Sequence, residues 1–425
     1  MHLHDLYQLF IKANQLVSTD TRQIKPASLF FALKGPNFNG NLFVEEALEK
    51  GAMYSISDEY VGSNPKVILV NDVLKTLQDL ANYHRKQLGI KVIGIGGSNG
   101  KTTTKELLHA CMSKSFNVFS TVGNLNNHIG VPLTLLQLTS NHQFAIVELG
   151  ANKGGDIDEL CLIAEPNYGV ITNIGKEHLE GFGDIEGVAK AESELYDYLL
   201  KNNGHSFVNE DDMWLMNMSK RLKNKTAYSI HSSQFTEVQL VPQISFKYNG
   251  LSFESPLFGA HNLQNIGAAI CISDYFGVKT ELIKEAIAAY YPQNNRSQII
   301  QTDKGNTLLM DAYNANPSSV ESALKTFSSM RDKPQFVVLG DMFELGSHEA
   351  AEHQAILDLC ASINGLKAIL VGNAFNHCNN TNSNIKTYAN KGEAMQYFAE
   401  MDVRDSNVLL KGSRSMKMEE FKTVF

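Results

Sequence analysis

The residues best suited to chemistry form one glycine-rich segment, Gly-Ile-Gly-Gly-Ser-Asn-Gly-Lys-Thr-Thr-Thr, over residues 94–104. It follows the apolar run 91–93 and precedes a helix-like segment, so it predicts a turn between a strand and a helix. Backbone N–H groups in such a turn are free to surround phosphate oxygens, and the helix N-terminus adds positive potential. Lys101 would contribute a point charge, and the hydroxyl of Thr102 suits Mg²⁺.

The spacing of this segment differs from the standard phosphate loop GxxxxGK[ST], because position 95 is Ile. The shorter form, Gly97-x-x-Gly100-Lys101-Thr102, still fits a phosphate loop. The alternative is a glycine-rich turn that contains Gly-Lys-Thr by chance. The flanking strand and helix favour the phosphate loop, so we expect the chain to bind a nucleoside triphosphate.

Two further side chains follow neighbouring apolar runs. Glu148 closes the run 144–147, and His178 follows the run 169–172. Ligands of open parallel sheets lie beyond the carboxyl ends of the strands, so both side chains are expected near the phosphate loop. A carboxylate there suits Mg²⁺. The alternatives are a surface or capping glutamate and a structural histidine.

Three polar turns also follow predicted strands. The segment 121–130 contains Asn126 and Asn127, and it lies where a substrate of the nucleotide unit could bind. The segments 311–317 and 411–414 place polar and cationic groups on one edge of the last predicted sheet. Ordinary turn and cap chemistry is the alternative for each of them.

Composition restricts the class of protein. The chain has 425 residues, which predicts two to four domains, and its net charge of −8 argues against a broad nucleic-acid surface. Its five cysteines are scattered without a Cys-x-x-Cys pair, which favours a reducing compartment and no zinc site. We see no secretory signal and no apolar stretch long enough for a membrane span, so we expect a cytoplasmic protein that binds no membrane.

The pattern of strands and helices predicts an α/β protein of three domains. Residues 1–87 form a small α/β unit, residues 88–294 form a central parallel-sheet unit that carries the phosphate loop, and residues 295–425 form a Rossmann-like α/β unit. The last unit begins with a predicted hairpin over 298–310. A short polar joint, Pro292-Gln293-Asn294-Asn295, permits hinge motion between the last two domains.

Several motifs together resemble the Mur ligases, the ATP-dependent amide-forming enzymes of cytoplasmic peptidoglycan precursor synthesis. The motifs are Gly97–Thr104, Glu148-Leu149-Gly150, Asn173-Ile174-Gly175 with His178, His261–Asn265, and Asn295-Arg296. Their order and spacing run across the whole chain. Other segments resemble the branch of the family that adds D-Ala-D-Ala to UDP-MurNAc-tripeptide, above all Tyr313-Asn314-Ala315-Asn316-Pro317 and the Gly-Asp-Met-x-Glu-Leu-Gly string over 340–346.

The resemblance implies roles for individual residues. The ATP phosphates would be held by Gly97, Ser98, Asn99, Gly100, Lys101, Thr102 and Thr103. Asn262 would contact adenine, while Arg296 and Asp311 would reach the phosphates and the ribose. Mg²⁺ would be bound by Thr102, Glu148, His178 and Glu192, and the catalytic set would be Lys101, Glu148, His178, Glu192 and Arg296.

It also implies where the other substrates bind. The uridine diphosphate end would contact Ser18, Thr19, Lys34 and Asn39 in the first domain. The dipeptide would contact Asn314, Lys411, Ser413 and Arg414 in the last. The expected protein is a monomer. The alternatives are a sister ligase that adds a single amino acid, folylpolyglutamate synthase, and a nucleotide-binding module without ligase chemistry.

One position departs from the family. Most members carry a lysine carbamate on the helix after the metal histidine, and here Glu192 occupies that position, in Ala189-Lys190-Ala191-Glu192. Glu192 could supply the same negative charge without CO₂, although its reach is shorter. Lys190 is a poor substitute, because two residues along a helix turn a side chain about 200° away. The alternative is that Glu192 is a solvated helix residue and one metal ligand is missing.

Overall fold

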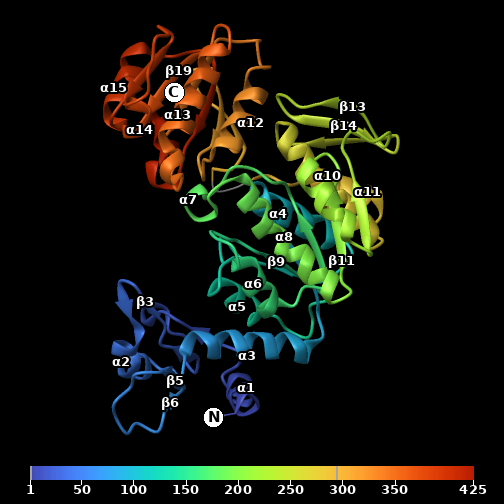
Figure 1. Ribbon diagram of the computed structural model, residues 1–425, viewed down its shortest axis with the longest axis vertical. Helices are drawn as coiled ribbons and strands as arrows, with labels where there is room; N and C mark the ends of the chain where they lie inside the picture. Colours follow the sequence, from blue (N-terminus) through green and yellow to red (C-terminus); the bar gives the residue numbers. More distant parts are fainter. Residues whose placement is uncertain (1, 293–294) are drawn as a thin grey trace.

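The computed structural model describes residues 2–292 and 295–425. Figure 1 shows three units along the long axis, with the N-terminal unit at one end, the central unit in the middle and the C-terminal unit at the other end. Met1, Gln293 and Asn294 lie outside the described residues, so the two middle residues of the predicted joint are not described.

The N-terminal unit is a four-stranded parallel sheet in the order β1-β2-β5-β6, with a small hairpin β3-β4. Its strands are β1 (Val17–Ser18), β2 (Leu29–Phe31), β3 (Lys34–Gly35), β4 (Phe38–Asn39), β5 (Tyr54–Ser57) and β6 (Val67–Leu69). Its helices are α1 (Leu3–Lys12), α2 (Val44–Glu49) and α3 (Val73–Leu88). The Asp72 side chain caps α3 at one end, and Gly89 ends it in the left-handed region.

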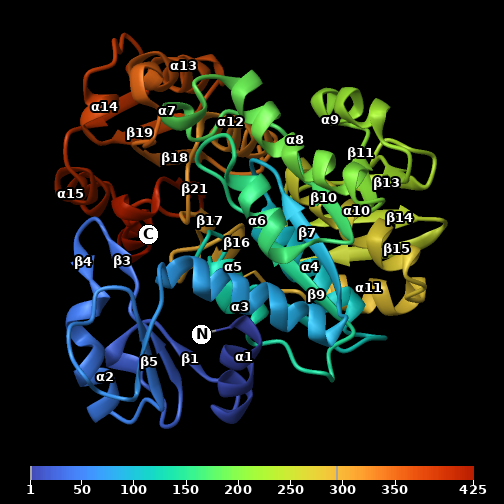
Figure 2. The same cartoon turned by 60° about the horizontal axis from the view of Figure 1, so that its bottom comes forward.

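Helix α3 joins the N-terminal unit to the central unit. It packs against α5 and α6 of the central unit, as Figure 2 also shows. Gln78 donates hydrogen bonds to Glu159 and to the carbonyl of His128, and Arg85 donates to Asn167 and to the carbonyl of Glu165. One hydrophobic cluster runs through both units, so α3 fixes the first unit on the second.

The central sheet has six parallel strands in the order β12-β11-β10-β7-β9-β8. The strands are β7 (Lys91–Gly96), β8 (Val118–Ser120), β9 (Phe144–Glu148), β10 (Tyr168–Ile171), β11 (His205–Asn209) and β12 (Lys225–Tyr228). The helices are α4 (Lys101–Met112), α5 (Gly130–Leu135), α6 (Asp156–Ala164), α7 (Leu179–Phe182), α8 (Ile185–Lys201), α9 (Met213–Met218), α10 (Ala260–Tyr275) and α11 (Thr280–Ala288).

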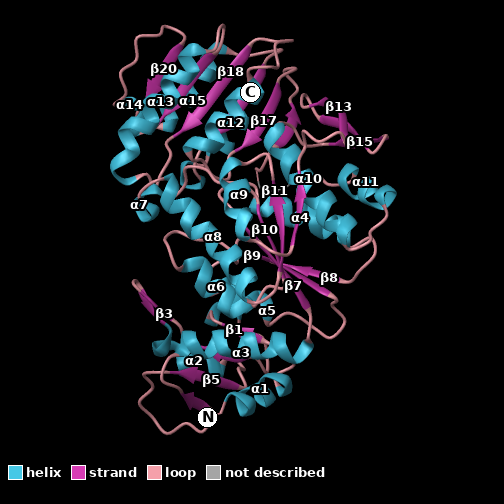
Figure 3. Ribbon diagram, turned by 45° about the vertical axis from the view of Figure 1, so that its right-hand side comes forward, coloured by secondary structure: helices cyan, strands magenta, loops and turns pink. Residues whose placement is uncertain are grey.

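Both faces of this sheet are covered. In β7, Val92 packs into the cluster formed with α5, α6 and α8, whereas Ile93 and Ile95 pack into the cluster formed with α4, α10 and α11. This explains why the strands are continuous apolar runs. Three antiparallel strands, β13 (Phe235–Gln239), β14 (Ile244–Tyr248) and β15 (Leu251–Ser255), form a separate small sheet, visible in Figure 3.

The C-terminal unit has a six-stranded sheet in the order β16-β17-β21-β18-β19-β20. The predicted hairpin is confirmed, because β16 is antiparallel to β17, while the other strands are parallel. The strands are β16 (Gln298–Gln301), β17 (Thr307–Asp311), β18 (Gln335–Gly340), β19 (Lys367–Val371), β20 (Ile385–Tyr388) and β21 (Asn407–Lys411). The helices are α12 (Pro317–Phe327), α13 (Glu349–Ser362), α14 (Asn373–Asn376) and α15 (Lys391–Met401).

The α/β fold class predicted from the sequence is confirmed, with a parallel central sheet and a third, mixed-sheet unit. Helix α1 was not predicted. Within the described residues, no helix is both long and apolar enough to span a membrane.

Candidate active site

The predicted phosphate loop connects β7 to α4. β7 is an inner strand of the central sheet, and the loop lies at its carboxyl end. Gly97 and Gly100 have φ values of +114° and +82°, in the region that favours glycine. A Cβ atom on Gly97 would lie 2.2 Å from Thr172 Oγ1, so the neighbouring strand leaves no room for a side chain. The loop therefore packs closely against the segment that follows β10.

The sequence predicts that the N–H groups of the loop have no partner in the protein, but three of them donate hydrogen bonds to other segments. The N–H of Gly97 donates to Glu192 Oε2 (2.6 Å), that of Ser98 to the carbonyl of Asn173 (2.9 Å), and that of Asn99 to Asn173 Oδ1 (3.1 Å). The first helical bond of α4 runs from the N–H of Thr104 to the carbonyl of Gly100. The N–H groups available to a phosphate hence include those of the first helical turn, Lys101 to Thr103, which have no helical partner.

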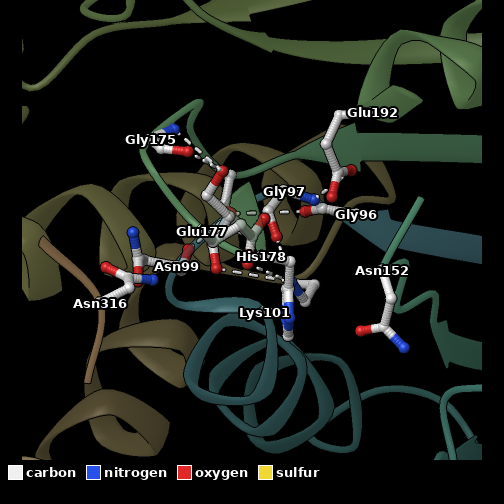
Figure 4. A network of polar contacts seen from close by, with 12 residues as sticks. Gly96, Gly97, Asn99, Lys101, Asn152, Gly175, Glu177, His178, Glu192 and Asn316 are labelled. Carbon is white, nitrogen blue, oxygen red and sulfur yellow. Dashed lines mark hydrogen bonds and ion pairs between the residues drawn. The ribbon is translucent and has the colours of Figure 1, made fainter. Parts of the chain in front are cut away.

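Lys101 lies at the centre of a buried polar network, shown in Figure 4. Its Nζ donates to the carbonyl of Gly97 and lies 3.7 Å from Glu177 Oε2. Burial disfavours the ammonium, but the carboxylates of Glu177, Glu192 and Glu148 outweigh this effect, so the pKa of Lys101 lies above its ordinary value. Lys101 therefore stays charged at neutral pH.

Glu177 and Glu192 are the two buried carboxylates of this network. Glu192 is 1% exposed, and burial raises the pKa of both groups, although Lys101 opposes the shift. One oxygen of each, Glu177 Oε1 and Glu192 Oε1, has no hydrogen-bond partner within the described residues. Glu177 faces the cavity, whereas Glu192 lies behind the loop and supports it from α8.

Glu148, at the end of β9, contacts both α4 and the loop that follows β8. Its Oε1 accepts hydrogen bonds from Thr102 Oγ1 (3.2 Å) and Asn126 Nδ2 (2.9 Å). Its Oε2 lies 3.4 Å from Nζ of Lys105, and both side chains are almost fully buried. Glu148 is consequently held in place by partners on two segments of the central unit, α4 and the loop after β8.

The chemistry of these donors fits Mg²⁺. Thr102 and Glu148 present a hydroxyl and a carboxylate at the cavity, and Mg²⁺ prefers oxygen ligands. Within the described residues, no three His, Cys, Asp or Glu side chains form a complete cage. Mg²⁺ commonly completes its shell with water and substrate phosphates, so one or two protein ligands suffice.

His178 faces the cavity from the segment after β10. Its backbone is left-handed, with φ of +43°, and its Nδ1 lies 2.6 Å from Oε2 of Glu344 in the C-terminal unit. Burial lowers the pKa of His178 although Glu344 raises it. The neutral imidazole is the form that can ligate a cation.

The C-terminal unit closes the cavity from the other side. Lys411 Nζ lies 2.5 Å from Asp311 Oδ2, and this ion pair lowers the pKa of Asp311 against the opposing effect of burial. The guanidinium of Arg296 lies 3.5 Å from the ring centre of Tyr313, a cation–π contact. Asn316 Nδ2 donates to Asn99 Oδ1 (2.9 Å), so the C-terminal unit touches the phosphate loop directly, as Figure 4 shows.

These groups line one cavity of about 370 Å³ between the central and C-terminal units. The sequence-predicted residues that line it are Ser98, Asn99, Gly100, Lys101, Thr102, Thr103, Asn126, Asn127, Glu148, His178, Asn262, Arg296, Asp311, Asn314 and Lys411. Asn262 is held by hydrogen bonds to the carbonyl of Phe258 and to Asn265. The predicted residues that do not line the cavity are Gly97, Glu192, Ser413, Arg414, Ser18, Thr19, Lys34 and Asn39.

Arg414 still contacts the cavity wall, because it donates a hydrogen bond to the hydroxyl of Tyr313 (3.2 Å). Ser413 donates to the carbonyl of Asp341 (2.9 Å), which does not line the cavity. Glu192 contacts the loop from behind, so its role as a metal ligand stays a prediction.

The residues predicted to bind the uridine diphosphate end lie in the N-terminal unit. Lys34 and Asn39, on the hairpin β3-β4, both contact the carboxylate of Glu59, at 2.7 Å each. Ser18 donates a hydrogen bond to the carbonyl of Asp20. The structure thus brings Lys34 and Asn39 together, and their role in substrate binding stays a prediction.

Sequence reasoning did not select several side chains that the structure places at the site, and four of them matter most for its chemistry. Glu177, Tyr313 and Asn316 line the cavity, and Lys105 pairs with Glu148 behind it. Tyr313 and Asn316 lie inside the Tyr-Asn-Ala-Asn-Pro string, which was the available signal for them. Nothing in the sequence distinguishes Lys105 from any other lysine on a helix.

The fold and the site together define a phosphate-loop enzyme whose active-site cavity is shared by two α/β units. Comparison with known families identifies it further. Residues 95–273 match the Mur ligase middle domain, and residues 295–414 match the Mur ligase glutamate ligase domain. This chain belongs to the Mur ligase family.

Individual relatives agree with this membership. The chain is 35% identical to UDP-N-acetylmuramoyl-tripeptide–D-alanyl-D-alanine ligase of Bacillus subtilis, over 95% of this chain and 91% of that one. It is 32% identical to the Escherichia coli protein of the same name, over 95% and 92%. Among solved structures, MurF from Acinetobacter baumannii superposes with a TM-score of 0.87 at 30% identity, covering 98% of this chain and 97% of that one. The MurF ligase from Thermotoga maritima in complex with ADP has the same fold, with a TM-score of 0.87 at 24% identity over 97% of each chain.

Proposed function

We propose that this chain is an ATP-dependent ligase that joins D-Ala-D-Ala to UDP-MurNAc-tripeptide and releases ADP and phosphate. The observation that carries the proposal is the cavity, in which the phosphate loop of the central unit faces Asp311, Asn314 and Lys411 of the C-terminal unit. The names of relatives that match nearly the whole chain support the choice of substrates. ATP and Mg²⁺ are the expected cofactors.

The chemistry begins with activation of the tripeptide carboxylate. One carboxylate oxygen attacks the γ-phosphorus of ATP, the bond to the β-phosphate oxygen breaks, and ADP leaves an acyl phosphate behind. Lys101 and the first-turn amides of α4 would neutralise charge on the phosphates, which is the main task in phosphoryl transfer. Mg²⁺ held by Thr102 and Glu148 would supply further charge neutralisation.

The second step forms the amide. The deprotonated amine of the dipeptide attacks the acyl carbon, the carbon–oxygen bond to phosphate breaks, and phosphate leaves while the nitrogen loses a proton. Water would hydrolyse the acyl phosphate, so the site must exclude it. The C-terminal unit, which contacts the phosphate loop through Asn316, is positioned to close the site.

The three units receive separate roles in this proposal. The N-terminal unit (residues 1–87) takes the uridine diphosphate end through Ser18, Thr19, Lys34 and Asn39, and the central unit (88–294) takes ATP. The C-terminal unit (295–425) takes the dipeptide through Asn314 and the 411–414 turn. We propose a cytoplasmic monomer, and the five free cysteines agree with a reducing compartment.

Measuring ADP release tests the proposal. ATP, Mg²⁺ and UDP-MurNAc-tripeptide are supplied with D-Ala-D-Ala in one reaction and with single amino acids in matched reactions. We expect turnover with the dipeptide and acyl hydroxamate when hydroxylamine replaces it. Turnover with a single amino acid would move the chain to a sister ligase, and no turnover with any amine would favour a nucleotide-binding module.

A second measurement concerns Glu192. Because a glutamate stands where most family members carry a lysine carbamate, we expect turnover to be the same in CO₂-depleted buffer and in buffer with added bicarbonate. Glu192→Lys is the matched variant, since it restores the residue that can be carbamylated, and its turnover is expected to rise when bicarbonate is added. Wild-type turnover that falls when CO₂ is removed would contradict the proposal that Glu192 takes the place of the lysine carbamate.

A further inference from the structure

The Gly-Asp-Met-x-Glu-Leu-Gly string of the C-terminal unit is not used by the proposed mechanism. Its start is anchored firmly on its own unit. Asp341 accepts hydrogen bonds from the N–H groups of Ala374 (3.0 Å) and Phe375 (3.1 Å), and the N–H of Met342 donates to Nε2 of the fully buried His353 (3.0 Å). Glu344 therefore projects from a fixed base.

Glu344 reaches the central unit at one segment, residues 176–183. Its carboxylate contacts His178 Nδ1, and its carbonyl accepts a hydrogen bond from the N–H of Glu180 (3.1 Å). Glu344 has φ of +63° and His178 has φ of +43°. Two left-handed, non-glycine residues at one contact indicate a geometry that the surrounding structure imposes, since this conformation is unfavourable for side chains other than glycine.

Other contacts attach the same segment to the C-terminal unit. Leu179 is buried in the hydrophobic cluster of that unit, together with Met342 and Leu345. Lys176 contacts two C-terminal residues: its Nζ lies 2.6 Å from Glu352 Oε1, and its N–H donates to Ser318 Oγ (2.8 Å). The segment that carries His178 belongs to the central unit by sequence and to the C-terminal unit by packing.

The contact decides which nitrogen of His178 carries its proton. An ionised carboxylate can only accept, so Nδ1 must be the protonated nitrogen, which leaves the Nε2 lone pair available for a cation. Histidines that bind metals usually donate their other ring N–H to such an acceptor. Here the acceptor comes from a different unit than the histidine.

We propose that Glu344 is a positioning residue that orients the His178 ring for the cation of the active site, so that this ligand is in place only when the C-terminal unit is docked. The inference rests on the proposed function for the identity of the site. In this proposal, the Gly-Asp-Met-x-Glu-Leu-Gly string connects docking of the C-terminal unit with assembly of the cation site.

The test compares Glu344→Ala and Glu344→Gln with Glu321→Ala, an exposed glutamate of α12 in the same unit that pairs with Lys325. Mn²⁺ binding is measured by electron paramagnetic resonance with a non-hydrolysable ATP analogue, and the His178 tautomer by ¹⁵N NMR on the metal-free protein. For Glu344→Ala we expect about 10- to 100-fold weaker Mn²⁺ binding and loss of the single Nδ1–H tautomer. Glu344→Gln should retain most of the Mn²⁺ affinity and of the Nδ1–H tautomer, because its amide oxygen can accept the hydrogen bond from His178 Nδ1. Glu321→Ala should match wild type in both measurements.

Steady-state kinetics give a third readout. Glu344→Ala is expected to lower kcat and raise the Mn²⁺ requirement without changing KM for the UDP substrate. Wild-type Mn²⁺ affinity and tautomer in Glu344→Ala, or equal losses in Glu321→Ala, would overturn the inference while leaving the ligase proposal intact. Conversely, a wild-type protein that shows the expected tautomer and Mn²⁺ binding but releases no ADP with any amine would overturn the ligase proposal alone.

Discussion

Replacing Lys101 with alanine is expected to lower kcat about 10³-fold, which corresponds to roughly 4 kcal/mol of transition-state stabilisation. Lys101 is the charged side chain at the N-terminus of α4, where the phosphates are expected. Its charge is maintained by Glu177, Glu192 and Glu148 despite burial. Lys105, one helical turn away, forms an ion pair with Glu148 and a hydrogen bond to the carbonyl of Gly123, so Lys105 is not free to take over the role of Lys101.

Lys114→Ala is the control for this prediction. Lys114 follows the end of α4 and forms an exposed pair with Glu285, so turnover should stay at the wild-type level. ADP release, nucleotide affinity and the midpoint of thermal unfolding are measured for both variants. A Lys101→Ala enzyme with turnover within tenfold of wild type would contradict the assigned role, provided that it folds like wild type.

The Glu148→Gln variant is expected to lose both stability and turnover. The substitution leaves Lys105, which is 2% exposed, without its ion-pair partner, and breaking a buried pair in this way costs about 3–5 kcal/mol. For a unit of about 200 residues, this lowers the midpoint of thermal unfolding by roughly 6–20 °C. Turnover should fall independently, because the carboxylate oxygen proposed to bind Mg²⁺ becomes an amide.

A double variant separates the two effects. Glu148→Gln combined with Lys105→Met removes both charges, so we expect most of the lost stability to return while turnover stays low. Glu285→Gln, which breaks the exposed pair with Lys114, is the control and should change the unfolding midpoint little. Calorimetry and the ADP-release assay provide the data. If the double variant recovered turnover as well as stability, Glu148 would be a structural residue and not part of the active site.

The local elements of the site could be predicted from the sequence. The phosphate loop, its strand and its helix are fixed by neighbouring residues: an apolar run, glycines at the positive φ positions 97 and 100, and a good helix former at 101. Glu148 and His178 could also be placed, because parallel strands end at the same edge of a sheet and their following residues meet there. The Mur ligase resemblance agreed with these positions.

The loop amides show where local reasoning failed. A strand–turn–helix pattern says that N–H groups are exposed by the turn, but it cannot say which acceptors approach from elsewhere. Glu192 lies 95 residues away from Gly97, and the Asn173 acceptor is on the segment that follows β10. The same limit hid the Lys105–Glu148 pair, which depends on which face of α4 points toward β9.

The sequence by itself determined the α/β class, the phosphate loop and the identity of the residues at the strand ends, because these depend on contacts within one strand–turn–helix unit. Only the tertiary structure decided that Glu192 supports the loop from behind, that Asn316 contacts Asn99, and that Glu344 binds His178. Each of these contacts joins segments that are far apart in the chain, two of them across the boundary between units. Their formation depends on how packed helices and whole units dock, to which hydrophobic burial between units, such as that of Leu179 among C-terminal side chains, contributes.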